Sequence, residues 1–390
     1  MLQVCDINKC SGCGACYSVC PHAAISMTER RLGTIMPDID SDKCVDCGLC
    51  VKVCPVNVPQ KQTEPSIAYA AYAKSPDERS SSASGGIATL LSRRVLEEGG
   101  VVYGCTMESP KKITHIRVDN PDALDMLKGS KYVQSQTAHV FREIRKDLNE
   151  NRTVLFIGTP CQVAGLKNYI GNARSSVNLM TVDLCCHGTP SQRLLYEHLS
   201  YLGVEDSSEL AFRDKANGQI QYVLKVRNGD RIYNNPAHRD YYMTGFLSGL
   251  FLRESCFTCQ YASSRRCSDL TLADHWAMGA CDDPEMVVSK GLSSVLVNSE
   301  KGRVLFESIR DVAVCEERPM KEALSNSQFI SPVVKPTDYD AFAESFEING
   351  YRTACKKFMP SYQRMLLGRM LKTMYYKWPL RQYIRKLLKR

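Results

Sequence analysis

The chain has 390 residues, of which 44% are hydrophobic and 24% are charged. This composition excludes extensive disorder, and 24 glycines and 17 prolines without a period exclude a collagen-like fibre. No apolar run reaches the roughly 20 residues that a membrane-spanning helix needs, and the amino terminus lacks the pattern of a secretory signal. We therefore expect a cytoplasmic protein of two or three domains.

Cysteine and positive charge are both concentrated in parts of the chain. Nineteen cysteines are too many for a typical cytosolic enzyme, and eight of them lie in the first 54 residues. The net charge is +8, yet residues 348–390 hold 12 of the 50 Lys and Arg residues and none of the 42 Asp and Glu residues. The basic character therefore belongs to the tail, and we expect no nucleic acid partner.

One cysteine motif occurs twice near the amino terminus. Residues 9–21 read KCSGCGACYSVCP and residues 43–55 read KCVDCGLCVKVCP. The spacing C-x2-C-x2-C-x3-C-P is that of bacterial ferredoxins with two [4Fe-4S] clusters, in which the fourth cysteine of each run binds the other cluster. Zinc sites use separated C-x2-C pairs, and disulfides do not suit a cytosolic chain. We assign one cluster to Cys10, Cys13, Cys16 and Cys54, and the other to Cys44, Cys47, Cys50 and Cys20.

The ferredoxin-type domain is expected over residues 1–62, and the proline-containing stretch 56–66 is expected to be a linker. Strands and helices then alternate, which predicts an α/β domain with a mainly parallel sheet. A hairpin is expected around Asn228-Gly229, between residues 219–227 and 230–234. Residues 250–285 are expected to be irregular. Strands are predicted at 67–73, 101–103, 154–157 and 179–184, and helices at 87–98, at 141–149 and from about 162.

A serine- and glycine-rich loop over residues 80–86 precedes the first of these helices. Exposed N–H groups at a helix start, with no side chain to block approach, suit a phosphate, so Ser84, Gly85 and Gly86 are a candidate cradle. The alternative is an ordinary capped helix. Ser130, Lys131 and Tyr132 form a second candidate wall, with a surface role for the lysine as the alternative. No G-x-G-x-x-G or G-x-x-x-x-G-K-[ST] motif is present.

Further cysteines in the body have the character of metal ligands. Cys256 and Cys259 form a C-x2-C clip, while Cys161 and Cys186 each follow a predicted strand. Loops after parallel strands meet at the carboxyl edge of the sheet, where ligands bind. Cys267 is a rival fourth ligand. A zinc site from Cys256, Cys259, Cys267 and His275, or a set of buried free cysteines, is the alternative.

Beyond residue 62 the chain contains several distinctive motifs. They are SASGGIATLL at 82–91, LKGSKYVQS at 127–135, LFIGTPCQVAGL at 155–166, DLCCHGTPS at 183–191, and SCFTCQYA with SDLTLADHW over 255–276. In these motifs the chain resembles the beta subunit of coenzyme F420 (deazaflavin) hydrogenases and dehydrogenases. The resemblance implies, over residues 63–345, a domain that binds FAD and a [4Fe-4S] cluster and passes electrons between a two-electron carrier and iron–sulfur partners. It favours Cys161, Cys186, Cys256 and Cys259 as the ligand set. Some relatives with the same amino-terminal domain resemble components of polysaccharide gene clusters.

Two histidines lie inside these motifs. His187 and His275, together with Lys131, are candidate catalytic groups beside a flavin, because imidazole titrates near neutral pH. A hydrogen-bonded structural role is the alternative for each histidine. The family pattern usually reads Phe-Trp-Gly where this chain reads His275-Trp276-Ala277, so the substrate pocket departs from the pattern.

Residues 346–390 are expected to form a basic helical tail. Within LRQYIRKLLKR at 380–390, leucine, isoleucine and tyrosine share one helical face and basic residues flank it. Such a helix suits an anionic membrane surface, here the inner face of the cell membrane. The alternatives are a helix docked on the enzyme and a nucleic-acid-binding segment.

Together these features predict an iron–sulfur flavoprotein oxidoreductase. The expected cofactors are two ferredoxin-type [4Fe-4S] clusters, a third cluster in the body, and FAD as the converter between two-electron and one-electron chemistry. The expected partners are a redox protein such as ferredoxin and a hydride carrier, either a deazaflavin or a nicotinamide. The alternative is a non-catalytic electron-transfer subunit of a larger redox complex.

Overall fold

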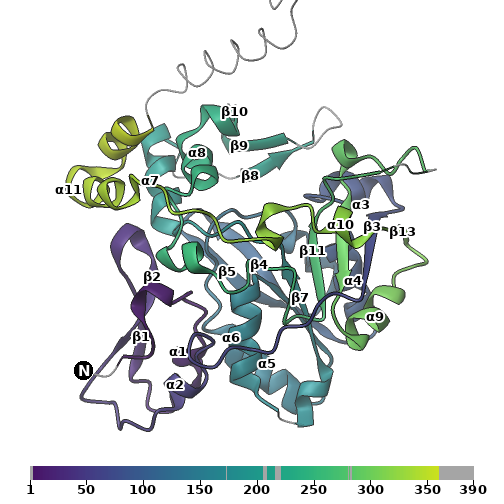
Figure 1. The fold of residues 1–390 in the computed structure, drawn as a ribbon, viewed down its shortest axis with the longest axis horizontal. Helices are drawn as coiled ribbons and strands as arrows, with labels where there is room; N and C mark the ends of the chain where they lie inside the picture. Colours follow the sequence, from purple (N-terminus) through teal and green to yellow (C-terminus); the bar gives the residue numbers. More distant parts are fainter. Residues whose placement is uncertain are drawn as a thin grey trace, which may run out of the picture.

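A computed structural model describes residues 3–172, 174–204, 209–215, 221–279, 281 and 283–359 (Figure 1). Residues 360–390, which contain most of the predicted basic tail, lie outside the described residues. Among the helices that are described, none is long and apolar enough to cross a membrane.

The amino-terminal domain is built from two short helices and two strands, and each helix belongs to one of the two cysteine runs. It contains α1 (Ala15–Val19), β1 (Ile25–Glu29), β2 (Ile35–Ile39) and α2 (Leu49–Lys52). The two strands pair antiparallel. Each helix begins after a glycine in the left-handed conformation, Gly14 with φ 77° and Gly48 with φ 71°. Other residues adopt this conformation only with strain, so the glycines let both cysteine runs turn in the same way.

The body is built on an eight-stranded mixed sheet with the order β13-β3-β12-β11-β7-β6-β4-β5. Only the neighbours β4, β6, β7 and β11 run parallel, and the outer strands pair antiparallel. The expectation of a mainly parallel sheet is therefore wrong for the outer strands. A short turn joins β4 to β5, and so short a connection permits only antiparallel pairing. The strands are β3 (Ile67–Ala73), β4 (Val101–Ser109), β5 (Lys112–Val118), β6 (Val154–Gly158), β7 (Leu179–Leu184), β11 (Leu270–Asp274), β12 (Ser293–Val297) and β13 (Ala313–Glu317).

Helices and short turns surround this sheet. Helix α6 begins at Pro160, earlier than expected, because Thr159 and Gln162 form a capping box and proline suits the first helical turn. The α-helices of the body are α3 (Pro76–Ser81), α4 (Ile87–Glu97), α5 (Val140–Asn149), α6 (Pro160–Ile170), α7 (Gln192–Leu202), α8 (Tyr241–Ser248), α9 (Glu300–Glu307), α10 (Met320–Ala323) and α11 (Tyr339–Phe358). The 3-10 helices are Ile7–Lys9, Arg31–Gly33, Pro121–Leu127, Arg174–Asn178, Ala237–Arg239, Glu254–Thr258, Val288–Lys290 and Ser327–Phe329.

Three local expectations can be compared with these elements. The hairpin at Asn228-Gly229 is confirmed and belongs to a three-stranded sheet of β8 (Glu209–Asp214), β9 (Gln221–Asn228) and β10 (Arg231–Pro236). Residues 250–285, expected to be irregular, contain strand β11 between β7 and β12. Helix α11 crosses the expected domain boundary at residue 346 and packs its aromatic residues into the same apolar core as α7 and α8.

The amino-terminal domain packs directly on the body, with α1 against α6 (Figure 1). A Cβ atom at Gly165 would lie only 2.6 Å from Sγ of Cys13, so glycine is required at this point of contact. The Thr137 hydroxyl donates to the Cys13 carbonyl at 2.9 Å, and the Ser18 hydroxyl donates to the Ala138 carbonyl at 2.6 Å. The contact is therefore close-packed and hydrogen-bonded at the backbone that carries the cysteines.

One buried cation joins the two parts. The side chain of Arg253 is 1% exposed and lies between them. Its guanidinium donates to the carbonyls of Cys10 at 3.1 Å and Ile35 at 3.0 Å, and to the side chain of Gln134 in the body. A buried cation is tolerated only when such acceptors replace water. Arg253 therefore fixes the amino-terminal domain to the body.

We expect Arg253→Gln to weaken this attachment, because buried carbonyl groups would lose their donors. The loss should lower the free energy of unfolding by roughly 2–4 kcal/mol. It should also speed proteolytic cleavage in the linker 56–66, measured under anaerobic conditions. The control is Arg30→Gln, which removes a solvent-exposed ion pair with Asp38 and should leave both quantities nearly unchanged. Equal cleavage rates in the two variants would contradict the role given to Arg253.

Candidate iron–sulfur sites

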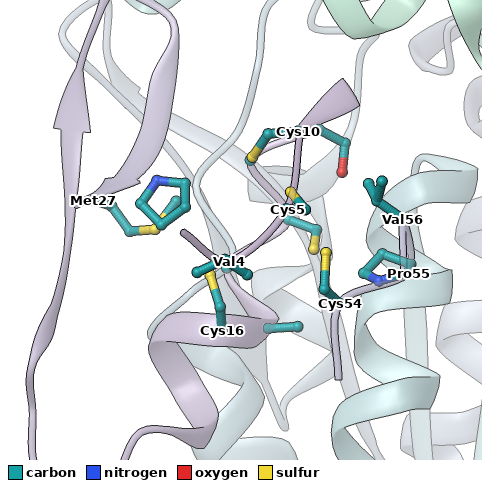
Figure 2. Close-up of a pocket in the computed structure, with 14 residues that line it drawn as sticks. Val4, Cys5, Cys10, Cys16, Met27, Cys54, Pro55 and Val56 are labelled. Carbon is teal, nitrogen blue, oxygen red and sulfur yellow. The ribbon is translucent and has the colours of Figure 1, made fainter. Parts of the chain in front are cut away.

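The first cavity lies at the buried end of the amino-terminal domain. Four of its lining cysteines come from both motif runs, and all four are buried. Apolar side chains such as Val4, Met27 and Val56 complete the wall, and the empty space is about 330 Å³ (Figure 2). The four cysteines are Cys10, Cys13, Cys16 and Cys54.

The thiols of the first cavity have different acidities. Burial raises the pKa of the Cys13 thiol to about 12. A hydrogen bond from the neighbouring thiol of Cys5 lowers the pKa of Cys10 to about 6, with help from the Arg253 guanidinium. The same neighbour lowers the pKa of Cys54 to about 7. Burial also raises the pKa of Cys16. Thiolates are the form that binds metal, so Cys10 and Cys54 are the two thiols of this cavity closest to that form at neutral pH.

The second cavity lies nearer the surface. Its lining includes Cys20 from the first run and three cysteines from the second, and its empty space is about 490 Å³. Cys47 is exposed to solvent. The rest of the wall is mainly apolar, with Ile25 and Ile39 on the strands and Val45 and Leu49 on the second run. The three cysteines of the second run are Cys44, Cys47 and Cys50.

The chemistry of both cavities fits a cluster better than a single ion. Each brings together three cysteines of one run and the fourth cysteine of the other, as the motif spacing predicts. Among the described residues, no three His, Cys, Asp or Glu side chains are arranged to bind one metal ion. Three thiols of one run and one of the other, lining one space, are the ligand set of an iron–sulfur cubane.

Four cysteines of the body also lie together. Cys161 opens α6 after β6, and Cys186 follows the neighbouring parallel strand β7. Burial raises the pKa of the Cys186 thiol well above its usual range, and the thiols of Cys256, Cys161 and Cys259 raise it further. Burial and Cys161 likewise raise the pKa of Cys259 to about 12. We call Cys161, Cys186, Cys256 and Cys259 the body thiol set.

The rival ligands of the zinc alternative have different surroundings. Sγ of Cys267 lies 4.0 Å from the carbonyl oxygen of Pro160, the residue before Cys161. The Cys267 thiol is buried near Asp183 and Lys167, and its pKa is raised to about 12 by burial and then by Asp183. Nδ1 of His275 lies 2.9 Å from the Ser294 hydroxyl, and its Nε2 lies 3.7 Å from a carboxylate oxygen of Glu322. Neither Cys267 nor His275 is among the principal electrostatic influences on the thiols of Cys186, Cys256 and Cys259.

The candidate phosphate cradle is engaged inside the protein. The Ser84 hydroxyl donates to the Leu292 carbonyl at 3.1 Å, and the Gly85 N–H donates to the Ser293 hydroxyl at 3.0 Å. A Cβ atom at Gly85 would lie 2.4 Å from the carbonyl oxygen of Ala71, so this glycine permits a close contact with β3. These two donors are not available to a phosphate, although Gly86 does begin α4 in the left-handed conformation.

The second candidate wall is engaged as well. The Lys131 ammonium donates to the carbonyls of Cys105, Leu127 and Lys128 at 2.7–3.0 Å. Tyr132 accepts a hydrogen bond from Nε of Arg213 at 2.6 Å and stacks on Phe246, and Ser130 hydrogen-bonds to Tyr132. Lys131 is thus half-buried, and its ammonium group is held by three carbonyl groups.

The two candidate histidines occupy hydrogen-bonded positions. His187 lies 3.2 Å from the Phe246 carbonyl through Nε2 and 3.0 Å from the Gln328 amide through Nδ1. Burial lowers the pKa of both His187 and His275, so both rings are neutral at pH 7. These contacts match the structural alternative for each ring.

Sequence patterns missed several polar groups beside these sites. Arg213 forms a two-pronged ion pair with Asp274, at 2.8 and 2.6 Å. Lys215 donates to the carbonyls of Arg79 and Ser84, and burial lowers its pKa to about 8. Asp274 lies in the motif SDLTLADHW, but no motif marked Arg213 or Lys215, because β8 reaches the Ser84 loop only through the tertiary fold.

Comparison with known protein families shows which family the chain belongs to. The amino-terminal model of the coenzyme F420 hydrogenase/dehydrogenase beta subunit matches residues 68–142, and the carboxyl-terminal model matches residues 151–323. The chain belongs to this family. A 4Fe-4S dicluster domain model matches residues 9–58, so an iron–sulfur domain precedes the family region. The expected resemblance is therefore confirmed.

Among solved structures, a chain of the F420-reducing [NiFe] hydrogenase complex from Methanosarcina barkeri is similar. The match covers 79% of this chain and 93% of that chain, with 17% sequence identity and a TM-score of 0.48. A search of curated proteins gave no match.

The grouping of thiols predicts the iron content. If two cubanes occupy the cavities and a third binds the body thiol set, the chain should hold about twelve iron atoms after anaerobic purification. Cys186→Ala should lower this to about eight, whereas the control Cys267→Ala should leave it unchanged. Iron, acid-labile sulfide and zinc should be quantified together. A loss of iron from the Cys267 variant, or stoichiometric zinc in the unaltered protein, would contradict the grouping.

Proposed function

We propose that this family member is a relay that carries single electrons through three [4Fe-4S] clusters. Its first cavity would hold the cluster of Cys10, Cys13, Cys16 and Cys54, its second cavity that of Cys20, Cys44, Cys47 and Cys50, and the body thiol set the third. When bound, such clusters accept and release one electron at a time. Family membership and the dicluster domain support a role in electron transfer.

The order of the sites supports a direction from the surface to the interior. Cys47 in the second cavity is exposed, whereas the four cysteines assigned to the first cavity are buried. Helix α1 contains Cys16 of the first cavity and is followed at once by Cys20 of the second. The two cavities are thus joined by less than two turns of chain.

The contact between α1 and α6 carries the proposal, because it joins the first cavity to the body thiol set. Cys13 lies against Gly165 on α6, the helix whose first turn holds Cys161. The negative charge that Cys161 would carry contributes to the raised pKa of Cys13. The first cavity is therefore the middle of three sites in series.

Arg253 supplies a positive charge to both neighbouring sites. Its guanidinium lowers the pKa of Cys10 in the first cavity and opposes the rise in the pKa of Cys256 in the body thiol set. A buried cation stabilises additional negative charge nearby, which is the change that reduction brings to a cluster. Arg253 would therefore also favour the reduced state of the clusters in the first cavity and the body thiol set.

Loss of the second cluster should slow the transfer of electrons from reduced ferredoxin into the protein. We expect Cys47→Ala to reduce by at least about tenfold the rate at which reduced ferredoxin reduces the remaining clusters, since the outermost carrier is gone. Stopped-flow absorbance, with cluster signals counted by electron paramagnetic resonance, measures this rate. Cys315→Ala, outside all three sites, is the control. An unchanged rate in the Cys47 variant would mean that electrons enter elsewhere.

Exchange of hydride with a carrier such as coenzyme F420 is a second candidate function, favoured by the family match. A hydride carrier delivers two electrons together and a cubane takes one, so a converter such as FAD is required between them. The polar groups first considered for its phosphates do not fit that role, because they are engaged within the protein. We therefore assign no residue to the flavin. We also propose that the protein serves a polysaccharide-related pathway and that its basic tail contacts an anionic membrane.

Flavin content decides the second candidate. We expect about one FAD per chain after anaerobic purification, and bleaching of its absorbance by reduced coenzyme F420 or by a reduced nicotinamide. High-performance chromatography of the released cofactor and anaerobic titration provide the measurements. Flavin-free protein with full iron content would reject hydride exchange and leave the electron relay as the function.

A further inference from the structure

A fifth cysteine lines the first cavity. Cys5 lies five residues before Cys10 and outside both motif runs, yet its side chain faces the same space as the four cysteines assigned to the cluster. Figure 2 shows Cys5 beside Cys10 and Cys54. The cavity therefore contains one thiol more than a cubane needs.

The segment that carries Cys5 is held against the segment that carries Cys54. The side-chain amide of Asn57 donates to the Val4 carbonyl at 2.8 Å, and the Asn57 backbone N–H donates to the Cys54 carbonyl at 3.0 Å. Val4 is 5% exposed and belongs to the apolar cluster around Cys16 and Cys54. The fifth thiol is thus a built part of the cavity wall.

Within the cavity, Cys5 lies next to two of the cysteines that are assigned to the cluster. Figure 2 shows Cys5 beside Cys10 and Cys54, and hydrogen bonds with these two thiols raise the pKa of the Cys5 thiol. Any ligand exchange that Cys5 undertakes would therefore concern Cys10 or Cys54.

We propose that Cys5 is a reserve ligand of the first cluster, able to take the place of Cys54 or Cys10 on iron. This inference rests on the proposed assignment of a [4Fe-4S] cluster to the first cavity. In the exchange the Cys5 thiol would release its proton and its thiolate would form a sulfur–iron bond, while the bond from the same iron to Cys54 or Cys10 breaks and the displaced thiolate takes up a proton. In the Cys54→Ala variant no bond has to break, because the iron lacks its former ligand and the Cys5 proton passes to solvent. No electron is transferred, and the cluster keeps its charge because one thiolate replaces another.

The second cavity is a natural control within the same chain. Its described lining contains four cysteines, the number that a cubane uses, and no fifth. Cys20 and Cys54 are equivalent by the duplication, since each is the fourth cysteine of its run and lines the other run's cavity. Removing Cys20 therefore repeats the loss of Cys54 where no reserve thiol is available.

The test compares four variants of the full chain, purified without oxygen. We expect Cys54→Ala and Cys5→Ala each to keep the iron and sulfide content of the unaltered protein. The double variant Cys5→Ala with Cys54→Ala should lose about four iron atoms, as should Cys20→Ala. The electron paramagnetic resonance spectrum of reduced Cys54→Ala should show a shifted first-cluster signal, which marks the new ligand. Circular dichroism confirms that each variant is folded.

Three results would overturn the proposal. Loss of about four iron atoms from Cys54→Ala alone would show that Cys5 does not replace it. The same loss from Cys5→Ala alone would make Cys5 an ordinary ligand. Full iron in the double variant would show that something other than Cys5 holds the cluster. Failure of the relay assignment is distinct, because the unaltered protein would then contain fewer than the roughly eight iron atoms of two cubanes.

Discussion

The buried guanidinium of Arg253 is the interaction on which the arrangement of the sites depends. It donates to backbone carbonyls of the amino-terminal domain and to a glutamine of the body, and it lies beside thiols of both. Burying a cation is costly unless several acceptors and a compensating negative environment surround it. The two parts of the chain must therefore keep one relative position, since separating them would leave these groups unpaired.

Two glycines allow the amino-terminal domain to pack closely on the body, which brings the first cavity near the body thiol set. Gly165 admits the Cys13 side chain to the surface of α6, and Gly14 admits Ala138 to within van der Waals reach of the α1 start. A side chain at either position would push the domains apart. The same packing that stabilises the contact therefore sets the spacing between the first cavity and the body thiol set.

The Ser84-Gly85-Gly86 loop shows how distant strands engage the polar groups of a local pattern. Ser84-Gly85-Gly86 before a helix has the composition of a phosphate loop, but Ser293 from β12 takes the Gly85 amide and Leu292 takes the Ser84 hydroxyl. Gly85 is small because Ala71 of β3 lies against it. Lys131 was expected to face a ligand or solvent and instead caps three carbonyl groups. Each outcome depends on strands far away in the sequence.

Features that depend on local spacing could be predicted from the sequence. Two cysteine runs with the same spacing specify which thiols share a cavity, because a short loop around a compact cluster allows few arrangements. Apolar periodicity located β3, β7 and α4 closely, since burial of one face is encoded in adjacent residues. The tertiary fold was needed to place Cys5 at the first cavity and to pair the outer strands of the sheet antiparallel. These features depend on contacts between segments that are distant in the sequence, and local residue spacing carries no information about such contacts.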